Sequence, residues 1–320
     1  MAEGDRPLVD PAFRDDVLAG LATRPRAIPA RWLYDQRGSE LFDLITHLPE
    51  YYPTRVETQI LEQSANQIGA LIGRGGAVVE FGAGSSTKTP MVLTVINPQI
   101  YVPIDISGEY LAASAARLGQ SFPQLTITPV VADFLNQLTL PDNCADLPML
   151  GFFPGSTIGN MVPQTAVQLL ANMAKVLGVG AKLLIGMDRI KSPDILIPAY
   201  DDVPGITAAF NLNLLVRING ELGGDIPVDE FIHKAVWNNG FARIEMHLRA
   251  RNDVAFTVAG KDFNMLRGET IHTENSHKYG ARDAALLLRA GGWEPIAEWT
   301  DDQDHFALIL AELQPPRYAP

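Results

Sequence analysis

The chain has 320 residues, 47% of them hydrophobic and 19% charged, a composition that can build a full core and is not that of a disordered chain. Its 37 acidic residues outnumber the 25 basic ones, and the net charge of −12 argues against nucleic acid as a partner, because surfaces that bind phosphate backbones are basic. The sequence has nothing close to the roughly 18 consecutive apolar residues that a membrane span needs, so we expect no membrane contact.

The first part of the chain, residues 10–75, predicts helices. The segment DPAFRDDVLAGLAT has an acidic start and spaced apolar positions, and SELFDLITHL opens with Ser39 as a candidate N-cap. From Gly76 onward, short apolar runs alternate with helical stretches. These strand-like runs are GAVVEFGAG, QIYVPIDIS, LTITPVVADF, LPMLGFFPGSTIGN and GAKLLIGMD.

Strands that alternate with helices predict βαβ units. We therefore expect an α/β fold with a mainly parallel, Rossmann-like sheet that is covered by helices on both faces. Ligands of such sheets bind at the carboxyl ends of the strands. The search for a site therefore concentrates on the loops that follow each apolar run.

After Asp188 the alternation stops, and the chain predicts first helix and loop and then the strands ARIEMHLRAR and VAFTVAG. Near the C-terminus the sequence again predicts a helix, followed by two strands that form a hairpin. We expect two parts, a sheet domain and a second α+β lobe that binds the substrate. Their predicted bounds are 56–191 with 279–320 for the sheet domain, and 9–55 with 192–278 for the lobe.

The N-terminus, MAEGDRPLVD, lacks the basic start and the apolar core of a signal peptide, and we expect a cytoplasmic protein. A single cysteine, Cys144, in an apparent loop, excludes an internal disulfide and a cysteine-cluster metal site. Six histidines invite a metal interpretation. However, His272 and His277 are not at helical ligand spacing and no carboxylate-rich triad accompanies them, so we nominate no metal ligand.

The sharpest pattern is VVEFGAGSSTKT, in which an apolar strand runs into Gly82 and Gly84. Asp105 ends the next strand, 21 residues after Gly84, near the spacing of about 20 at which a carboxylate reaches a ribose hydroxyl. The third glycine of the dinucleotide fingerprint is missing, because position 87 is Thr, and the chain has no Gly-Lys-Ser/Thr triplet. The pattern predicts a nucleoside site and disfavours a pyrophosphate cofactor.

The order Glu-x-Gly-x-Gly after the first strand, an acid after the second and Asp133-Phe134 after the third resembles the class I S-adenosylmethionine-dependent methyltransferases. That resemblance implies S-adenosyl-L-methionine as the cofactor and an antiparallel hairpin at the C-terminus. It places Gly82 and Gly84 at the methionine part and Asp105 at the ribose diol. Asp133 and Phe134 would then hold the adenine.

Further motifs carry a closer resemblance, to the L-histidine Nα-methyltransferases of ergothioneine biosynthesis. The match runs from about Pro11 to Leu313, and its most specific runs are Tyr-Tyr-Pro-Thr-Arg at 51–55 and Gly-Ser-Thr-Ile-Gly-Asn at 155–160. The other matching runs are WLYD at 32–35, GSELFD at 38–43, AYDD at 199–202, RIEM at 243–246 and TENS at 273–276. Members of this family transfer three methyl groups in succession to the α-amine of histidine, giving the betaine hercynine.

The family resemblance also implies residue roles. Tyr51 and Asn160 would orient the α-amine, which is their catalytic role, and Tyr200 with Asn160 would hold the carboxylate. At the imidazole the resemblance places Glu274 and Ser276, and Asn275 is a further candidate for substrate binding. Tyr34, Phe42 and Met246 would wall the pocket, and Lys88 would lie beside the cofactor.

The residue types suit this chemistry. Methyl transfer from a sulfonium is an in-line displacement that needs a neutral amine, so the task of the protein is orientation. Tyr51 and Asn160 can hold the amine without a fixed charge. The trimethylated product is a cation, which aromatic walls such as Tyr34 and Phe42 can stabilise by roughly 0.5 to 2 kcal/mol.

Glu274 and Ser276 lie two residues apart in an extended segment, so both point to the same side of a strand. A carboxylate and a hydroxyl can serve the two nitrogens of an imidazole. They also penalise an indole or apolar side chain, which would leave them unpaired. These residues therefore favour histidine over tryptophan as the substrate.

Several alternatives stay open. The same fold and chemistry could act on another amine such as a prenylated tryptophan, and Glu274 with Met246 would decide between them. A nucleic-acid methyltransferase is opposed by the charge and by Phe153-Pro154-Gly155-Ser156, where Asn/Asp-Pro-Pro-Tyr is usual. A nicotinamide-dependent oxidoreductase and a non-catalytic cofactor sensor are further alternatives. For the histidine methyltransferase we expect a monomer whose partners are small molecules, L-histidine and its mono- and dimethyl intermediates.

Overall fold

The computed structural model describes residues 10–84, 88–136 and 138–315, which form two compact units. The first unit comprises Met1–Glu50, Pro193–Gly240 and Ile244–Asn275. The second unit comprises Tyr51–Ser192, Phe241–Arg243 and Ser276–Pro320. Most of the N-terminal segment searched for a signal peptide, and Thr87 of the glycine pattern, lie outside the described residues.

The second unit is built on an eight-stranded sheet with the order β13-β14-β7-β6-β2-β3-β4, and β5 also pairs with β3. Its strands are β2 (Ala77–Phe81), β3 (Ile100–Asp105), β4 (Thr126–Ile127), β5 (Val130–Val131), β6 (Met149–Phe153), β7 (Lys182–Asp188), β13 (Trp293–Thr300) and β14 (Phe306–Leu313). The pairs from β4 to β7 are parallel, whereas β14 runs antiparallel to both β7 and β13. The predicted mainly parallel sheet and C-terminal hairpin are confirmed.

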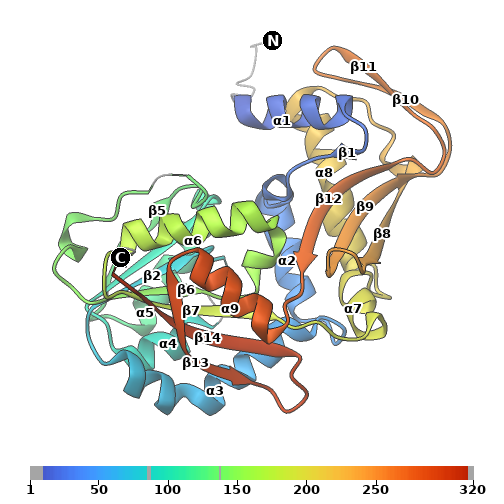
Figure 1. The fold of residues 1–320 in the computed structure, drawn as a ribbon. Coiled ribbons are helices and arrows are strands. Elements are labelled where there is room, and N and C mark those ends of the chain that lie inside the picture. The colour runs from blue at the N-terminus through green and yellow to red at the C-terminus, as the bar shows by residue number, and fades with distance from the viewer. Residues whose placement is uncertain (1–9, 85–87, 137, 316–320) are drawn as a thin grey trace, which may run out of the picture. The chain divides into compact units, whose positions relative to one another are not determined.

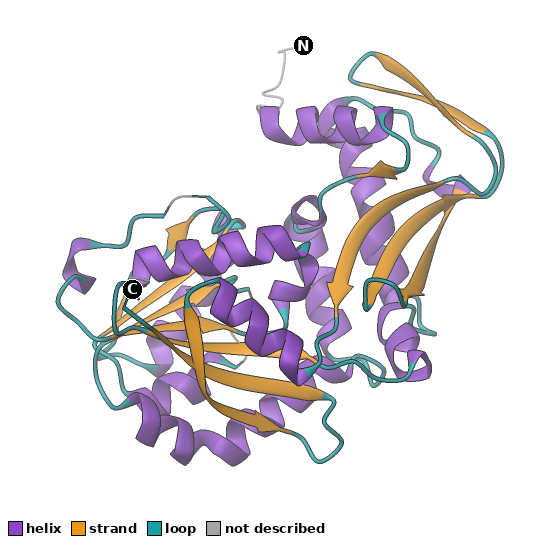
Figure 2. Ribbon diagram, viewed as in Figure 1, coloured by secondary structure: helices purple, strands orange, loops and turns teal. Residues whose placement is uncertain are grey.

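Helices cover both faces of this sheet (Figure 2). They are α3 (Tyr52–Ile72), α4 (Thr89–Ile96), α5 (Gly108–Ser121), α6 (Pro163–Leu177) and α9 (Ala281–Ala290). Apolar residues of α3, α4 and α5 pack on one face, and those of α6 and α9 pack on the other. Because both faces are buried, the central strands are nearly continuous apolar runs, which is why the sequence predicts them well.

Two short 3-10 helices complete the second unit, η2 (Asp142–Cys144) and η3 (Thr157–Asn160). The sequence predicted a loop around Cys144, and the structure has turns and irregular backbone there, with η2 as a single short 3-10 turn. Cys144 ends η2 and is buried in the core beneath the sheet, at 1% exposure. Burial raises the pKa of its thiol, so the side chain behaves as a small apolar group.

The first unit contains helices and a smaller sheet (Figure 1). Its helices are α1 (Pro11–Ala22), η1 (Ala30–Leu33), α2 (Gln36–Thr46), α7 (Pro193–Tyr200), α8 (Ile206–Leu222) and η4 (Val228–Glu230). Its strands are β1 (Arg26–Ala27), β8 (Phe231–Asn238), β9 (Arg243–Ala250), β10 (Val254–Val258), β11 (Lys261–Met265) and β12 (Thr270–His277). The four-stranded sheet has the order β1-β12-β9-β8, and β10 and β11 form an antiparallel hairpin.

The start of helix α2 and the presence of strand β8 differ from the sequence prediction. Helix α2 begins before Ser39, because Asp35 is its N-cap and accepts a hydrogen bond from the Gly38 N–H at 2.7 Å. Strand β8 was not predicted, since its polar residues His233 and Lys234 interrupt the apolar pattern. Across the described residues, none of the helices combines the length and the apolar character needed to cross a bilayer.

Candidate active site

The loop after β2 lies against the end of β3. The N–H groups of Gly82 and Ala83 both donate to the carbonyl of Ile104, at 2.9 and 3.0 Å. Gly82 has a φ of +75°, a conformation that side chains disfavour. A Cβ at this position would lie 3.5 Å from the ring of Phe134. Because glycine has no side chain, only backbone atoms of the loop lie beside this aromatic ring.

The predicted partners Gly84 and Asp105 meet in the structure. The Gly84 N–H donates to Asp105 Oδ2 at 3.2 Å, and the Ser107 N–H donates to Oδ1 at 2.9 Å. Each carboxylate oxygen is thus fixed by a backbone amide and keeps further acceptor capacity. This arrangement suits the binding of a pair of neighbouring hydroxyls.

Asp133 and Phe134 follow β5, which pairs with β3, at the same edge of the sheet. Asp133 Oδ1 accepts a hydrogen bond from the Leu135 N–H at 2.9 Å, which shapes the turn. The ring of Phe134 packs edge-on against Phe153, with 5.8 Å between centroids. The structure therefore brings Phe134 to the glycine loop, as the cofactor prediction requires.

Lys88 is held by a carboxylate that the sequence analysis did not nominate. Glu57 of α3 is fully buried, pairs with the Lys88 ammonium and accepts the Gly155 N–H at 2.9 Å through Oε2 and 3.1 Å through Oε1. Gly186 makes room for this carboxylate, because a Cβ there would lie 2.1 Å from Glu57 Oε1. One buried carboxylate therefore joins the loop after β2 to the loop after β6.

A second buried network surrounds Asp188 at the end of β7. Its carboxylate accepts hydrogen bonds from the Tyr52 hydroxyl at 2.8 and 2.9 Å and pairs with Lys191 Nζ at 2.6 Å and Lys278 Nζ at 2.7 Å. The Asp188 N–H in turn donates to Ser156 Oγ at 2.9 Å. The network ties the start of α3, the loop after β6 and the chain after β12 to one point of the sheet edge.

The charged groups in this network shift one another's pKa. Burial alone raises the pKa of Asp188, but the nearby ammonium groups of Lys278 and Lys191 outweigh it and lower the pKa overall. Burial lowers the pKa of Lys191 to about 8, against the attraction of Asp188. The carboxylate therefore stays ionised at neutral pH, and its partners hold it in place.

Ser276 and Asn160 belong to the same edge. Lys278 Nζ donates to Ser276 Oγ at 2.8 Å, and the Tyr279 hydroxyl donates to the Ile158 carbonyl, within η3, at 3.4 Å. Asn160 is the last residue of η3. Tyr51 directly precedes α3 and is 7% exposed. The second unit thus carries three of the nominated substrate residues, Tyr51, Asn160 and Ser276.

The first unit carries the others, and Tyr34, Phe42 and Glu274 are brought together. The Tyr34 hydroxyl donates to Glu274 Oε1 at 3.2 Å. Its ring packs edge-on against Phe42 at 5.6 Å and against Phe210 of α8 at 5.4 Å. Phe210 was not nominated from the sequence, because a phenylalanine on an apolar helix face carries no signal beyond packing.

Tyr200 and Met246 are also buried in the first unit. Tyr200 ends α7, and its carbonyl lies 2.7 Å from Nε2 of His233. Asn211 Nδ2 donates to His233 Nδ1 at 2.9 Å, so Nε2 carries the ring proton and donates to Tyr200. Met246 lies in β9 at 1% exposure, and its carbonyl accepts a hydrogen bond from Thr273 at 3.1 Å.

Asn275 lies apart from its two neighbours in the chain. Successive side chains of a strand point to opposite faces, so Asn275 of β12 points away from the side of Glu274 and Ser276. Its Oδ1 atom is buried and has no hydrogen-bond partner in the part of the chain that the structure describes. A role for Asn275 in substrate binding stays a prediction.

The glutamate of the Glu-x-Gly-x-Gly pattern points into the interior. Glu80 accepts hydrogen bonds from the Tyr101 hydroxyl at 2.6 Å and the Thr89 hydroxyl at 2.8 Å. Burial raises its pKa to about 7, although both hydrogen bonds favour the ionised form. Glu80 therefore fastens β2 to β3 and to the start of α4.

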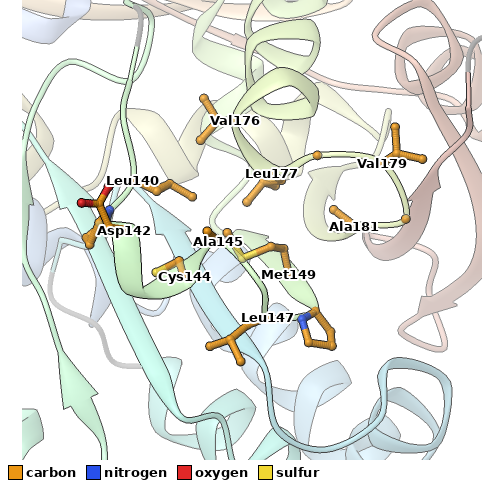
Figure 3. Close-up of a pocket in the computed structure, with 14 residues that line it drawn as sticks. Leu140, Asp142, Cys144, Ala145, Leu147, Met149, Val176, Leu177, Val179 and Ala181 are labelled. Atoms are coloured by element: carbon orange, nitrogen blue, oxygen red, sulfur yellow. The ribbon is translucent and has the colours of Figure 1, made fainter.

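A pocket of about 430 Å³ in the second unit lies at the other end of the sheet (Figure 3). Its lining includes Cys144 and Met149, just before and at the start of β6, and Leu177 and Ala181, which precede β7. These positions are the amino ends of the parallel strands. Because ligands of such sheets bind at the carboxyl ends, this pocket is separate from the candidate site.

Comparison with known proteins agrees with these features. Residues 13–313 match the family described as histidine-specific methyltransferase, SAM-dependent. The histidine N-alpha-methyltransferase of Mycolicibacterium smegmatis is 39% identical over 310 residues, which cover 94% of each chain. The ergothioneine biosynthesis protein 1 of Neurospora crassa is 29% identical over 304 residues, which cover 90% of this chain and 33% of that protein.

A 4-dimethylallyltryptophan N-methyltransferase of Claviceps purpurea is more distant, with 25% identity over 331 residues that cover 95% of this chain and 96% of the relative. The predicted class I sheet order, the glycine loop beside Asp105 and the match across nearly the whole chain agree with one another. The chain therefore belongs to the histidine-specific, S-adenosylmethionine-dependent methyltransferase family.

Proposed function

We propose that this protein transfers three methyl groups in succession from S-adenosylmethionine to the α-amine of L-histidine, giving hercynine, the first step of ergothioneine biosynthesis. The observation that carries the proposal is the match of the histidine-specific family across residues 13–313. The contact of the glycine loop with Asp105 supports the proposal, because these residues are the ones proposed to bind the cofactor.

The residues at the sheet edge fit the cofactor. S-adenosylmethionine, when bound, supplies a methyl group on a positively charged sulfur. Asp105 offers acceptor capacity for the ribose hydroxyls, and Phe134 offers an aromatic face for the adenine. Gly82 lets the backbone approach the methionine part without a side chain in the way. The edge needs no phosphate-binding loop, because this cofactor has no phosphate.

Tyr51 and Asn160 are proposed to orient the amine. Only a neutral amine has the lone pair that attacks the methyl carbon, so binding must favour the deprotonated form. A hydroxyl and an amide hold it without adding a charge. Each transfer forms a carbon–nitrogen bond and breaks a carbon–sulfur bond. In the first two rounds it also leaves a proton on the nitrogen, which passes to water either directly or by relay through the Tyr51 hydroxyl.

Glu274 and Ser276 are proposed to select the imidazole. The Tyr34 hydroxyl holds the Glu274 carboxylate, and the Lys278 ammonium holds the Ser276 hydroxyl. Two polar groups with fixed positions would be left unpaired by an indole, which costs more binding free energy than a missing methylene. Tyr34 and Phe42 are proposed as walls of this pocket, and Met246, Tyr200 and Asn275 as further substrate residues.

Mass spectrometry tests the function directly. The purified protein is mixed with S-adenosylmethionine and, in separate reactions, each of the twenty amino acids and a prenylated tryptophan. We expect mass gains of one, two and three methyl groups on histidine alone. Methylation of the tryptophan derivative instead would keep the fold and the cofactor but overturn the roles of Glu274 and Ser276. Binding of cofactor with no methylation would overturn the enzymatic proposal.

We also propose that the enzyme is a cytoplasmic monomer whose partners are small molecules. The net charge of −12 supports the absence of a nucleic-acid partner. Light scattering coupled to size-exclusion chromatography measures the mass, and 34.9 kDa is the value expected for one chain. A mass of twice that value would contradict the monomer.

A further inference from the structure

A cluster of metal-ligand side chains lies on the four-stranded sheet of the first unit. Glu245 and His247 are on β9, and His272 is on the neighbouring strand β12. One carboxylate oxygen and one ring nitrogen from each histidine all lie within 4.8 Å of one another. All three side chains are half-buried, so solvent and ions can reach them. None of the three is used in the function proposed above.

The surroundings already orient two of the three groups. Asn238 Nδ2 donates to Glu245 Oε1 at 2.9 Å, which fixes the carboxylate. His272 Nε2 lies 3.0 Å from the carbonyl of Glu274, which can only accept. Nε2 therefore carries the proton, and Nδ1 of His272 keeps its lone pair. Metal-binding histidines have this same arrangement, in which one ring nitrogen donates to a carbonyl and the other binds the ion.

One buried ring nitrogen of His247 lacks a hydrogen-bond partner within the described residues. Its Nε2 lies 3.2 Å from Glu245 Oε2, but its Nδ1 atom is buried and has no hydrogen-bond partner among residues 10–84, 88–136 and 138–315. A buried nitrogen without a partner costs free energy, and such atoms in native structures often mark an ion or water site. The imidazole ring also stacks on that of His272, with 4.8 Å between centroids and 25° between planes.

We propose that Glu245, His247 and His272 bind one divalent transition-metal ion. Two imidazoles and one carboxylate suit zinc and its neighbours, whereas calcium and magnesium prefer oxygen ligands alone. The His247 ring turns about its Cβ–Cγ bond to face the ion, and this torsion has broad minima. Three protein ligands leave a further coordination position for water.

The bound ion would link β9 to β12. One of its proposed ligands, His272, is in contact with Glu274. His272 connects the two places, because its ring nitrogen bonds to the Glu274 carbonyl. The proposal stands independently of the histidine methyltransferase activity, since it concerns the binding of a metal alone.

Zinc binding to the full chain tests the proposal. The protein is freed of any histidine tag, stripped with a chelator and titrated with Zn²⁺ by calorimetry in a buffer without histidine. We expect one ion per chain. His247→Ala and His272→Ala should each weaken binding by about tenfold or more. Co²⁺, used as a spectroscopic substitute, should give visible absorption bands that are lost in both variants.

A matched control is His47→Ala. His47 follows α2 in the same unit and bonds to the Asp43 carbonyl, outside the cluster, so this variant should bind zinc as tightly as the unaltered protein. If His247→Ala fails to fold by circular dichroism, Glu245→Gln tests the same site with little change of shape. Absence of zinc binding, or binding that persists in folded variants of the cluster, would overturn the proposal.

Discussion

Lys278 Nζ donates a hydrogen bond to Ser276 Oγ at 2.8 Å and at the same time lies 2.7 Å from Asp188 Oδ2. The Lys278 side chain is completely buried. An ammonium has no lone pair, so the serine oxygen is the acceptor in this bond and its one proton points elsewhere. Ser276, which we propose to contact the imidazole, is therefore oriented by a buried ion pair.

Lys278→Met is expected to raise the KM for histidine about tenfold, the kinetic equivalent of roughly 1.4 kcal/mol of lost binding. The KM for S-adenosylmethionine should change by less than about twofold, because Lys278 acts through Ser276. Steady-state kinetics with each substrate varied in turn make the measurement. Lys182→Met is the control, since Lys182 donates to the Leu71 carbonyl at an exposed position at the start of β7. An unchanged histidine KM in a folded Lys278→Met protein would contradict the orienting role.

Tyr34→Phe removes the hydroxyl that donates to Glu274 at 3.2 Å and keeps the ring that packs on Phe42 and Phe210. We expect the KM for histidine to rise about fivefold, in line with one neutral donor to a carboxylate. The melting temperature should stay close to that of the unaltered protein, because the apolar packing is retained. Equal losses for histidine and for S-adenosylmethionine would contradict a role confined to Glu274.

Asp105→Asn is expected to weaken cofactor binding by about 10- to 100-fold, because hydrogen bonds to a charged group are worth roughly 1.5 to 3 kcal/mol. Calorimetry with S-adenosylhomocysteine measures the dissociation constant. Asp142→Asn, in the pocket at the amino ends of the strands, is the control and should bind normally. If both variants bound the product equally well, the ribose assignment of Asp105 would be wrong.

The raised pKa of Glu80 makes a prediction about stability and pH. The folded protein holds this proton up to about pH 7, whereas the unfolded chain releases it near the ordinary value of 4.5. Between these values the folded state binds more protons, so this group makes the free energy of unfolding fall as pH rises. Glu80→Gln keeps an acceptor for Tyr101 and Thr89 but lacks the titration.

Urea unfolding at pH 5 and pH 8 measures this effect. Relative to the unaltered protein, Glu80→Gln should gain stability on going from pH 5 to pH 8. The same difference between the two proteins at both pH values would show that Glu80 titrates normally.

Local patterns explain how much of the fold and site could be predicted. The buried parallel strands are continuous apolar runs, and the distance from Gly84 to Asp105 is set by one βαβ unit, so spacing alone brings these residues together. The nominated roles of the substrate residues came from the family resemblance and stay predictions, although the contact between Tyr34 and Glu274 supports two of them.

Contacts between distant segments explain what was missed. Asp188 and Lys278 are 90 positions apart, and His247 meets His272 only because β9 and β12 are neighbours in the sheet. No spacing rule relates such pairs. Glu57 did leave a signal, because it falls on the same face of α3 as the buried Ile60 and Leu61. A carboxylate on an apolar helix face needs a partner inside the protein.

The carboxylate of Glu57 has a practical consequence for anyone who redesigns this enzyme. It pairs with Lys88 from one loop and accepts the Gly155 N–H from another, and it occupies the space that a side chain at Gly186 would fill. If only one of the two loops were replaced by that of a relative, the new loop would have to fit a Glu57 carboxylate that is still bound to the other loop. These four positions form one set of contacts, which a redesign must exchange together or leave untouched.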